Sequence, residues 1–419
     1  MTGAHAVLLP RRAAVVVFLA FAGAYFLSAL LRAVTATLSP VLTAEFNLHA
    51  RDLGLLAGGY FLGFAAMQLP LGAWLDRHGP KKVILGLLTL AVAGCAVFAL
   101  AGGFSGLMAA RVLMGMGVAA CLMAPLTGYR RWFDAGTQLR ANAWMLMTGS
   151  LGMLASTLPV QWLLPVLGWR ALFWGLAALV LVVMAVIALA VPNWHTDAAK
   201  KIANNVDSTA TGSQKDSYSE IVRNAYFRRA TPLGAVCFGG MVAIQSLWAG
   251  PWLTRVAGAT PLQAATGLFW LNLGMLLTFW GWGLLLPRLA ARGLSVDRLV
   301  ARLQPFSFVA LALLVAAGPA LGGWSVALLA LYCMLSTPSA QVQPVVALAF
   351  PPQLAGRALS AYNLVIFVGI FLVQWGIGLG ADAFESLGWS AADALRGAMG
   401  VFGALSAACW VRFVWAGRG

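Results

Sequence analysis

The sequence carries little charge for its length. Only 9% of its 419 residues are Asp, Glu, Lys or Arg, whereas a soluble globular protein carries about 25%. Hydrophobic residues make up 61% of the chain. This composition excludes an ordinary soluble protein and is typical of a chain that crosses a membrane many times.

Acidic residues, histidines and cysteines are also scarce, with twelve Asp and Glu, four His and five Cys. The cysteines lie in apolar runs, at no metal-ligand or redox spacing, so we interpret them as packing residues. The sequence shows no nucleophile–base pair and no phosphate-binding loop. We therefore expect no enzyme activity, no metal and no cofactor. The cysteines are Cys95, Cys121, Cys237, Cys333 and Cys409.

Long apolar runs are what the sequence has in abundance. A helix that crosses the roughly 30 Å hydrocarbon core of a bilayer needs about 20 apolar residues, and we count about twelve such runs. They predict an all-α membrane protein with twelve transmembrane helices. The first run is too long for the apolar core of a signal peptide, so it is kept as a span. The approximate spans are 13–40, 52–75, 82–101, 105–128, 140–164, 169–191, 231–254, 262–287, 300–318, 322–350, 357–380 and 394–415.

The basic residues follow the predicted topology. With the N-terminus inside, cytoplasmic segments hold 21 of the 27 Lys and Arg, and outer segments hold four. This bias is the positive-inside rule, so the net charge of +15 indicates orientation and not nucleic-acid binding. We expect both termini in the cytoplasm and the protein in the inner (plasma) membrane. The two remaining basic residues, Arg32 and Arg111, lie inside spans and away from the span ends.

The chain divides into two halves. A polar stretch predicts a cytoplasmic linker at 192–229, between an N-terminal six-helix bundle (1–191) and a C-terminal six-helix bundle (230–419). "LDRHG" at 75–79 corresponds to "LAARG" at 289–293. "PVQWLLPVLGW" at 159–169 corresponds to "LVQWGIG" at 372–378 followed by "SLGW" at 386–389. These repeats favour two pseudo-symmetric bundles. At the end of the linker, "YSEIVRNAYFRR" predicts an interfacial helix with Ile221, Val222, Tyr226 and Phe227 toward lipid.

Two motifs carry a family resemblance. The loop after the second span, "GAWLDRHGPKK", resembles the loop 2–3 signature of the major facilitator superfamily, and "RVLMGMG" in the fourth span resembles a second superfamily pattern. The resemblance implies a transporter with twelve helices in two bundles, in which the loop is a cytoplasmic latch. The latch would place Asp76 and Arg77 against the start of the eleventh span near Arg357. The motif residues are Gly72, Asp76, Arg77, Gly79, Lys81 and Lys82 in the loop, and Arg111, Gly115 and Gly117 in the fourth span.

Departures from the superfamily patterns narrow the range of transporter types that the sequence resembles. The second copy of the loop keeps Gly293 but has Ala290 in place of the aspartate, so we expect a latch in one half only. The fifth span lacks the Gly-x-x-x-Gly-Pro run of drug/proton antiporters, which disfavours that class.

Arg32 is the best clue to the substrate. An arginine at the centre of a span costs about 2.5–3.5 kcal/mol on insertion scales, and none of the twelve acidic residues lies in the middle of a span. An anionic substrate would supply the missing counter-ion. Tyr25, Ser28 and Arg32 share one helix face. The alternative is a structural Arg32 that extends toward Glu45 or Asp52 near the outer surface.

Other polar and aromatic residues within the spans are candidates for the walls of a substrate cavity. Superfamily members that carry organophosphates pair an arginine in the first span with one in the seventh. The seventh span here has none, which favours a monoanion such as a carboxylate. We assign Trp162, Trp169, Trp389 and Trp415 to the interfacial aromatic belt. The candidates are Tyr60, Gln68, Asn142, Gln245, Trp248, Asn272, Gln341, Tyr362, Asn363 and Gln374.

The sequence thus predicts a secondary active or facilitative transporter that moves a small organic anion by alternating access. It would act as a monomer in the bilayer, by exchange, by facilitated flux or by symport with protons handled near Glu45, Asp52 or Asp382. One alternative is an exporter of a hydrophobic or cationic compound, with Arg32 structural. Another is a membrane sensor that binds a ligand without transporting it.

Overall fold

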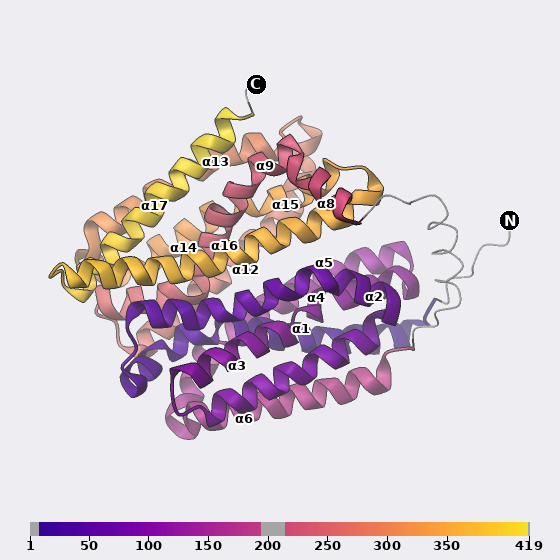
Figure 1. Ribbon diagram of the computed structural model, residues 1–419, viewed down its shortest axis with the longest axis horizontal. Helices are drawn as coiled ribbons and strands as arrows, with labels where there is room; N and C mark the ends of the chain where they lie inside the picture. Colours follow the sequence, from indigo (N-terminus) through magenta and orange to yellow (C-terminus); the bar gives the residue numbers. More distant parts are fainter. Residues whose placement is uncertain (1–7, 194–213, 418–419) are drawn as a thin grey trace.

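The computed structural model describes residues 8–193 and 214–417, and the predicted linker falls partly in 194–213, outside the described residues. The described chain is built from helices alone (Figure 1). The N-terminal half contains α1 (Arg11–Phe46), α2 (Ala50–Leu100), α3 (Phe104–Gly117), α4 (Ala120–Trp132), α5 (Ala135–Ala155) and α6 (Leu158–Ala190). The C-terminal half contains α8 (Gln214–Arg223), α9 (Ala225–Pro232), α10 (Gly239–Ala243), α11 (Ala249–Pro251), α12 (Pro261–Ala291), α13 (Val296–Ala317), α14 (Ser325–Ser336), α15 (Val342–Leu348), α16 (Pro352–Ser386) and α17 (Ala391–Trp415).

Nine helical stretches of the described chain are long and apolar enough to cross a membrane. Two of them, Ala50–Leu100 and Val296–Leu348, each cover two of the predicted spans. The predicted span 140–164 corresponds to α5 and the first turns of α6. The helical membrane fold is confirmed, whereas the number of crossings and the location of the termini stay predictions.

Four glycines with positive φ lie at or next to the ends of the repeated motifs. Gly79 (φ 78°) and Gly293 (φ 74°) close the two copies of the loop motif. Gly168 (φ 70°) and Gly388 (φ 89°) stand before Trp169 and Trp389 in the other repeat. Only glycine adopts this backbone region without a steric penalty. The same turn at matching places in both halves supports the internal repeat.

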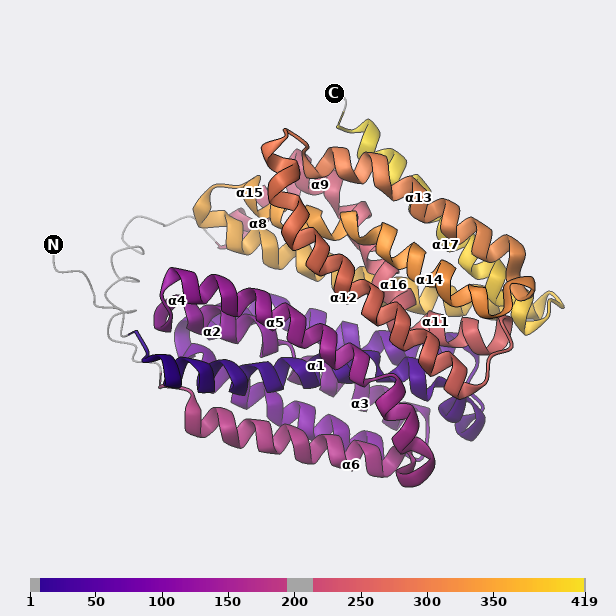
Figure 2. The same cartoon turned by 180° about the vertical axis from the view of Figure 1, so that it is seen from behind.

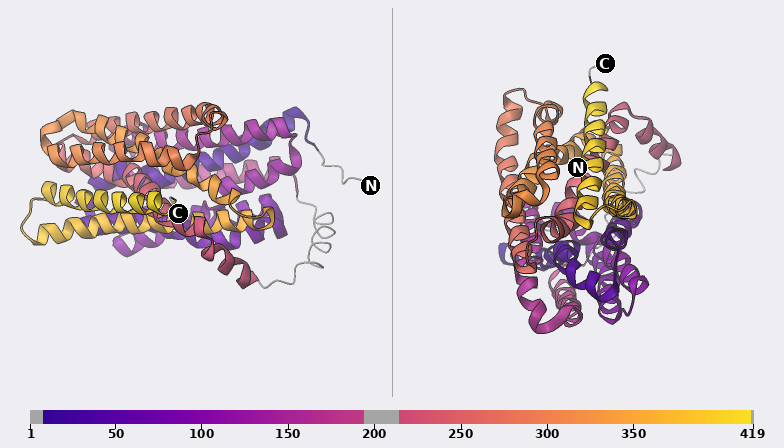
Figure 3. Two further views of the ribbon diagram at one scale, coloured as in Figure 1. Left: turned by 90° about the horizontal axis from the view of Figure 1, so that it is seen from above. Right: turned by 90° about the vertical axis from the view of Figure 1, so that its left-hand side faces the viewer.

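Helices of the two halves meet along one side of the molecule. We call the side with the α1–α2 and α16–α17 junctions the outer side, following the predicted topology; it lies on the left in Figure 1. Toward the other side the ribbons of the two halves diverge, as Figure 2 also shows. An end-on view in Figure 3 shows the two groups of helices, indigo to magenta and orange to yellow.

The contact between α2 and α16 depends on glycine. A Cβ on Gly54 would collide with the carbonyl oxygen of Gln374, and one on Gly378 would collide with the Ala50 carbonyl. Further along, the rings of Phe64 and Phe367 lie 4.4 Å apart. Small residues at these positions let the two helices approach to backbone contact.

An aspartate from one half caps a helix of the other. The Asp382 carboxylate of α16 accepts hydrogen bonds from the backbone N–H groups of Ala50 (3.0 Å) and Arg51 (3.3 Å), in the first turn of α2. The Arg51 guanidinium lies 3.6 Å from the same carboxylate. A negative charge at a helix N-terminus is stabilising, so this bridge, which we call the outer lock, holds the two halves together on the outer side.

The prediction that the segment after the linker turns its apolar side chains toward lipid is wrong for two of its four residues, whereas Val222 is 58% exposed. Ile221 and Phe227 are buried in protein, and the Phe227 ring packs edge-on against Phe350 and Tyr362. Trp169 is buried as well, and its indole N–H donates to Glu45 at 2.6 Å. Amphipathic spacing identifies an apolar face but does not say whether lipid or a neighbouring helix covers it.

Candidate functional site

Arg32 lies deep within α1. It precedes the end of that helix, at Phe46, by 14 residues, or about 21 Å at 1.5 Å per residue. Its guanidinium group interacts with the hydroxyls of Tyr25, on the same helix, and of Tyr60, on α2. Tyr60 is fully buried and donates a hydrogen bond to the backbone carbonyl of Ser28 at 2.9 Å. These contacts orient the arginine with neutral groups.

The acidic residues nearest in sequence have other partners. Glu45 forms an ion pair with Arg170 at 2.7 Å. Asp52 accepts a backbone bond from His49 and lies beside Arg51. Among residues 8–193 and 214–417, none of the ion pairs includes Arg32. The structural alternative for Arg32, an outward reach to Glu45 or Asp52, is therefore not the arrangement found.

Arg111 is a second arginine within the helices, fully buried and next to the half-buried Arg32. Its guanidinium donates to the carbonyl oxygens of Leu31 (2.7 Å), Leu56 (3.3 Å) and Arg32 (3.5 Å). It also lies 5.0 Å from the centre of the Tyr60 ring, in a cation–π contact. Arg111 on α3 thus joins the backbones of α1 and α2 at the level of Arg32, and two positive charges share one tyrosine.

Two glycines of the fourth-span motif, Gly115 and Gly117, bring α3 close to α2. A Cβ on Gly115 would collide with the carbonyl of Tyr60, and one on Gly117 would collide with the backbone of Ala91. Both neighbours belong to α2, whose two arms enclose α3. Gly115 and Gly117 therefore allow α3 to pack closely against α2.

Amide side chains of the C-terminal half face the interface between the halves. The Gln245 amide donates to Asn272 Oδ1 at 2.9 Å and lies 4.0 Å from the Met153 sulfur of α5. The Gln374 amide donates to Ser246 at 3.0 Å, and its own Oε1 is buried without a partner among the described residues. These groups offer neutral donors and acceptors close to the N-terminal half, which Gln245 reaches at Met153.

The remaining cavity candidates are dispersed. Gln68 is buried and bonds to its own helix at Phe64, and the Trp248 indole donates to the Gln374 carbonyl at 3.1 Å. The Tyr362 hydroxyl donates to the Ala230 carbonyl at 3.3 Å. Three others are Asn142, whose Oδ1 is buried and unpaired within the described chain, Asn363, which accepts from Gln343, and the half-buried Gln341.

The loop motif lies on the side opposite the outer lock. Gly79 supplies the left-handed turn that ends the second span. Asp76 is exposed, and its electrostatic neighbour is Arg130 of α4. Gly72, Arg77 and Lys82 are exposed and Lys81 is half-buried. The latch contact with the start of α16 stays a prediction.

Sequence reasoning missed several features of the site. The seventh span contains three π-helical turns, Leu233–Phe238, Ile244–Trp248 and Trp252–Val256. Such turns often occur at functional sites, and the middle one carries Gln245. The contacts of Met153 and Ser246, and the role of Asp382, were also missed. Glycines and a proline in "GGMVAIQSLWAGP" are the nearest signal, but they do not specify a π turn.

Membrane-length apolar helices, two repeated halves and a fully buried arginine, Arg111, between helices define an integral multi-pass membrane protein. The chain belongs to the Major Facilitator Superfamily, whose family model matches residues 21–374.

Three curated relatives show where the sequence similarity lies. The inner membrane transport protein YajR of Escherichia coli is 32% identical over 176 residues, 41% of this chain and 35% of the relative. The hexuronate transporter of Escherichia coli is 28% identical over 144 residues, 34% of this chain and 33% of the relative. The 4-hydroxybenzoate transporter PcaK of Acinetobacter baylyi is 24% identical over 279 residues, 59% and 60% of the two chains. The matches thus span about a third to three fifths of these relatives.

Solved structures match over nearly the whole length. A bacterial homologue of the human lysosomal transporter Spinster, in an inward-facing and unoccupied conformation, gives a TM-score of 0.74 at 18% identity and 98% coverage of both chains. A D-xylose–proton symporter gives 0.74 at 15% identity, covering 96% of this chain and 97% of the other. At these identities the likeness establishes the fold alone.

Proposed function

We propose that the protein is a secondary carrier that moves a small organic monoanion, such as a carboxylate, through alternating access of its two halves. The observation that carries this proposal is the environment of Arg32. Its side chain is held by two tyrosine hydroxyls, with a second arginine behind it and no ion-pair partner within the described chain. A bound anion would restore charge balance in a medium where unpaired charge is costly.

The names of two relatives support an anionic substrate. Hexuronate and 4-hydroxybenzoate are both carboxylates, although they differ in shape and in polarity. Arg32 would bind the carboxylate through its planar fork, which matches the two oxygens. Gln245 and Asn272, from the other half, would contact the rest of the substrate and so make its binding depend on how the halves are arranged.

The contacts between the halves support an inward-facing state. The outer lock and the glycine contacts join α2 to α16 on the outer side. The ribbons diverge on the opposite side. In this arrangement the substrate would exchange with the cytoplasm, and separation of α2 from α16 would give access from outside.

Counterflow in proteoliposomes tests the proposal. Purified protein would be reconstituted with unlabelled 4-hydroxybenzoate or galacturonate inside, and uptake of the same labelled acid would be followed. We expect counterflow with the wild type, its loss with Arg32→Ala, and partial retention with Arg32→Lys, which keeps the charge but not the fork. Arg302→Ala, at an exposed position of α13, is the matched control and should transport normally.

The alternatives predict other outcomes in the same assay. An exporter of cationic compounds would move tetraphenylphosphonium and would be insensitive to Arg32→Ala. A sensor would bind an acid in a thermal-shift measurement yet show no counterflow. Counterflow of an acid that survives Arg32→Ala unchanged would also contradict the role given to this arginine.

A further inference from the structure

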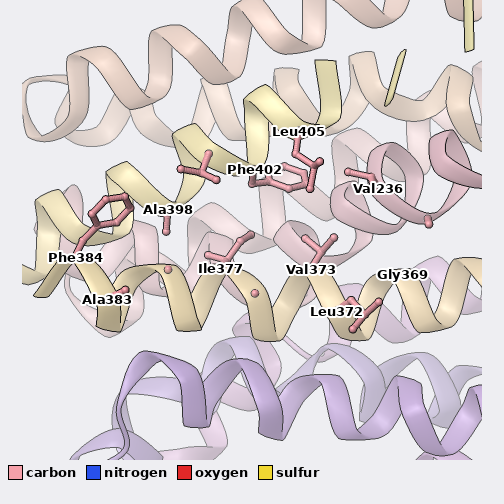
Figure 4. Close-up of a pocket in the computed structure, with 14 residues that line it drawn as sticks. Val236, Gly369, Leu372, Val373, Ile377, Ala383, Phe384, Ala398, Phe402 and Leu405 are labelled. Carbon is pink, nitrogen blue, oxygen red and sulfur yellow. The ribbon is translucent and has the colours of Figure 1, made fainter. Parts of the chain in front are cut away.

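An apolar groove lies on the outer half of the C-terminal bundle, whereas Arg32 and Arg111 belong to the N-terminal half. It has a volume of about 500 Å³ and is formed by α16 and α17, with Ala235 and Val236 of the π-helical turn after α9 at its base. Figure 4 shows Val373 and Ile377 of α16 facing Phe402 and Leu405 of α17 across it. None of the described residues that line the groove has a charged or amide side chain. A polar metabolite would lose its hydration there without replacement, so the groove suits a hydrocarbon ligand.

The groove opens sideways onto the surface of the membrane-crossing helices. Three of its lining residues, Leu372, Val401 and Leu405, have exposed fractions of 52%, 61% and 51%. Large apolar side chains with this exposure on membrane-length helices face lipid. The groove is therefore continuous with the lipid-covered surface, and the bilayer is the source of its ligand.

Small residues of α16 create the space. Gly376 has no atom within 4 Å of an ideal Cβ position, so its hydrogen borders an open volume. The lining residues of α16 run from Gly369 to Phe384, which is about 22 Å of helix. Half of the hydrocarbon core measures about 15 Å. The groove is thus long enough to take one acyl chain from the outer interface past the bilayer midplane.

The outer end of the groove is marked by aromatic residues. The ring of Phe384, which lines the groove, stacks on Trp389 with ring centres 4.8 Å apart. Trp389 is 48% exposed, next to the α16–α17 junction. Tryptophan at such a position is typical of the headgroup level, where an acyl chain of the outer leaflet begins.

We propose that this groove is a binding site for one acyl chain of an outer-leaflet phospholipid. The chain lies along α16 between Phe384 and Gly369 and packs behind the helix face that contacts α2. This site is separate from the proposed substrate site and does not depend on what the protein transports.

Photolabelling in lipid vesicles tests the site. Full-length protein would be reconstituted in phosphatidylethanolamine–phosphatidylglycerol vesicles with a trace of phosphatidylethanolamine whose acyl chain carries a diazirine. After illumination, adducts would be mapped by mass spectrometry. We expect saturable adducts on α16 and α17 peptides that line the groove, in excess over other lipid-facing helices.

A variant whose groove is filled by a larger side chain provides the second test of the site. Gly376→Leu places a side chain in the open volume and should lower labelling of these peptides about tenfold, the change that corresponds to about 1.4 kcal/mol. Gly175→Leu is the matched control, because Gly175 is also an exposed helical glycine with nothing within 4 Å of its Cβ position. It should leave the labelling unchanged, and thermal unfolding would verify that both variants fold.

Three results would overturn the proposal. The first is labelling spread evenly over all lipid-facing helices, and the second is labelling that a folded Gly376→Leu variant retains. The third is displacement of the label by free oleate but not by unlabelled phospholipid, which would assign the groove to a free fatty acid.

Discussion

Tyr60 connects the two arginines of the candidate site. Its hydroxyl donates to the Ser28 carbonyl and interacts with Arg32, and its ring faces Arg111. One side chain therefore contacts both α1 and α2 and also orients the Arg32 guanidinium. Sequence spacing places Tyr25, Ser28 and Arg32 on one face of α1, but it does not reveal that α2 supplies the facing hydroxyl.

Replacing Tyr60 by phenylalanine should weaken anion binding without unfolding the protein. The variant keeps the ring that packs on Arg111 and loses the hydroxyl that orients Arg32. A hydrogen bond to a charged group contributes about 1.5–3 kcal/mol, so we expect the Kd for the transported acid to rise about tenfold or more. Ligand-dependent thermal shift would measure it.

Tyr129→Phe is the control for that experiment. The Tyr129 hydroxyl is buried and has no hydrogen-bond partner within the described chain. Its removal should leave binding unchanged and stability equal or higher, because an unsatisfied buried hydroxyl is costly. Equal effects of the two substitutions would contradict the role of Tyr60.

Arg111→Lys should destabilise the N-terminal half. Lysine is a point charge on a flexible chain and cannot bond the carbonyl oxygens of α1 and α2 together as the guanidinium fork does. We expect a loss of about 2 kcal/mol in unfolding free energy, together with weaker anion binding. Denaturant unfolding of the detergent-solubilised protein measures the first effect. Arg292→Lys, at an exposed position, should change neither.

At the scale of helices, the packing of α2 against α16 determines how the two halves contact each other on the outer side. The sequence predicts both helices and the glycines that end the repeats. It does not predict that Gly54 meets the backbone of Gln374 or that Asp382 caps α2. These contacts join residues more than 300 positions apart, and helical periodicity carries no information about such pairs.

Loss of the outer lock should shift the conformational equilibrium. Asp382→Ala removes the acceptor of two backbone N–H groups and the partner of Arg51. We expect the population with an open outer side to rise about tenfold, as for a loss of about 1.4 kcal/mol. Spin labels at Gly102 and Leu387, both exposed, would report it as a longer distance in pulsed dipolar spectroscopy.

Glu385→Ala provides the comparison, since Glu385 lies one turn further along α16. It should leave the distance distribution as in the wild type. An unchanged distribution for Asp382→Ala would show that the glycine contacts alone keep the outer side closed.

At the scale of the whole molecule, composition and the distribution of Lys and Arg were sufficient to predict a helical membrane protein, and the loop motif was sufficient for its family. The burial of Ile221, Phe227 and Trp169 was not predictable, because lipid and protein interior select the same apolar side chains. For the same reason the residues of the apolar groove are indistinguishable in the sequence from ordinary core.

Reporter fusions should verify the orientation. Fusions that end after Gly79 or Gly293 should place the reporter in the cytoplasm, where green fluorescent protein fluoresces. Fusions after Gly168 or Gly388 should place it outside, where alkaline phosphatase is active. The four sites are the left-handed turns that end the repeats. A fusion on the wrong side would contradict the twelve-crossing topology at that turn.

The glycine contacts between α2 and α16 also bear on how fast the proposed carrier would cycle. Gly54, Gly58 and Gly378 have no side-chain rotamers to lose. Interfaces built from long side chains forfeit up to about 2 kcal/mol of conformational entropy for each residue that becomes ordered. Here the two helix surfaces can separate and rejoin with little of that entropy cost. The free-energy barrier to separating them would then come mainly from the few polar groups that must exchange their protein partners for water.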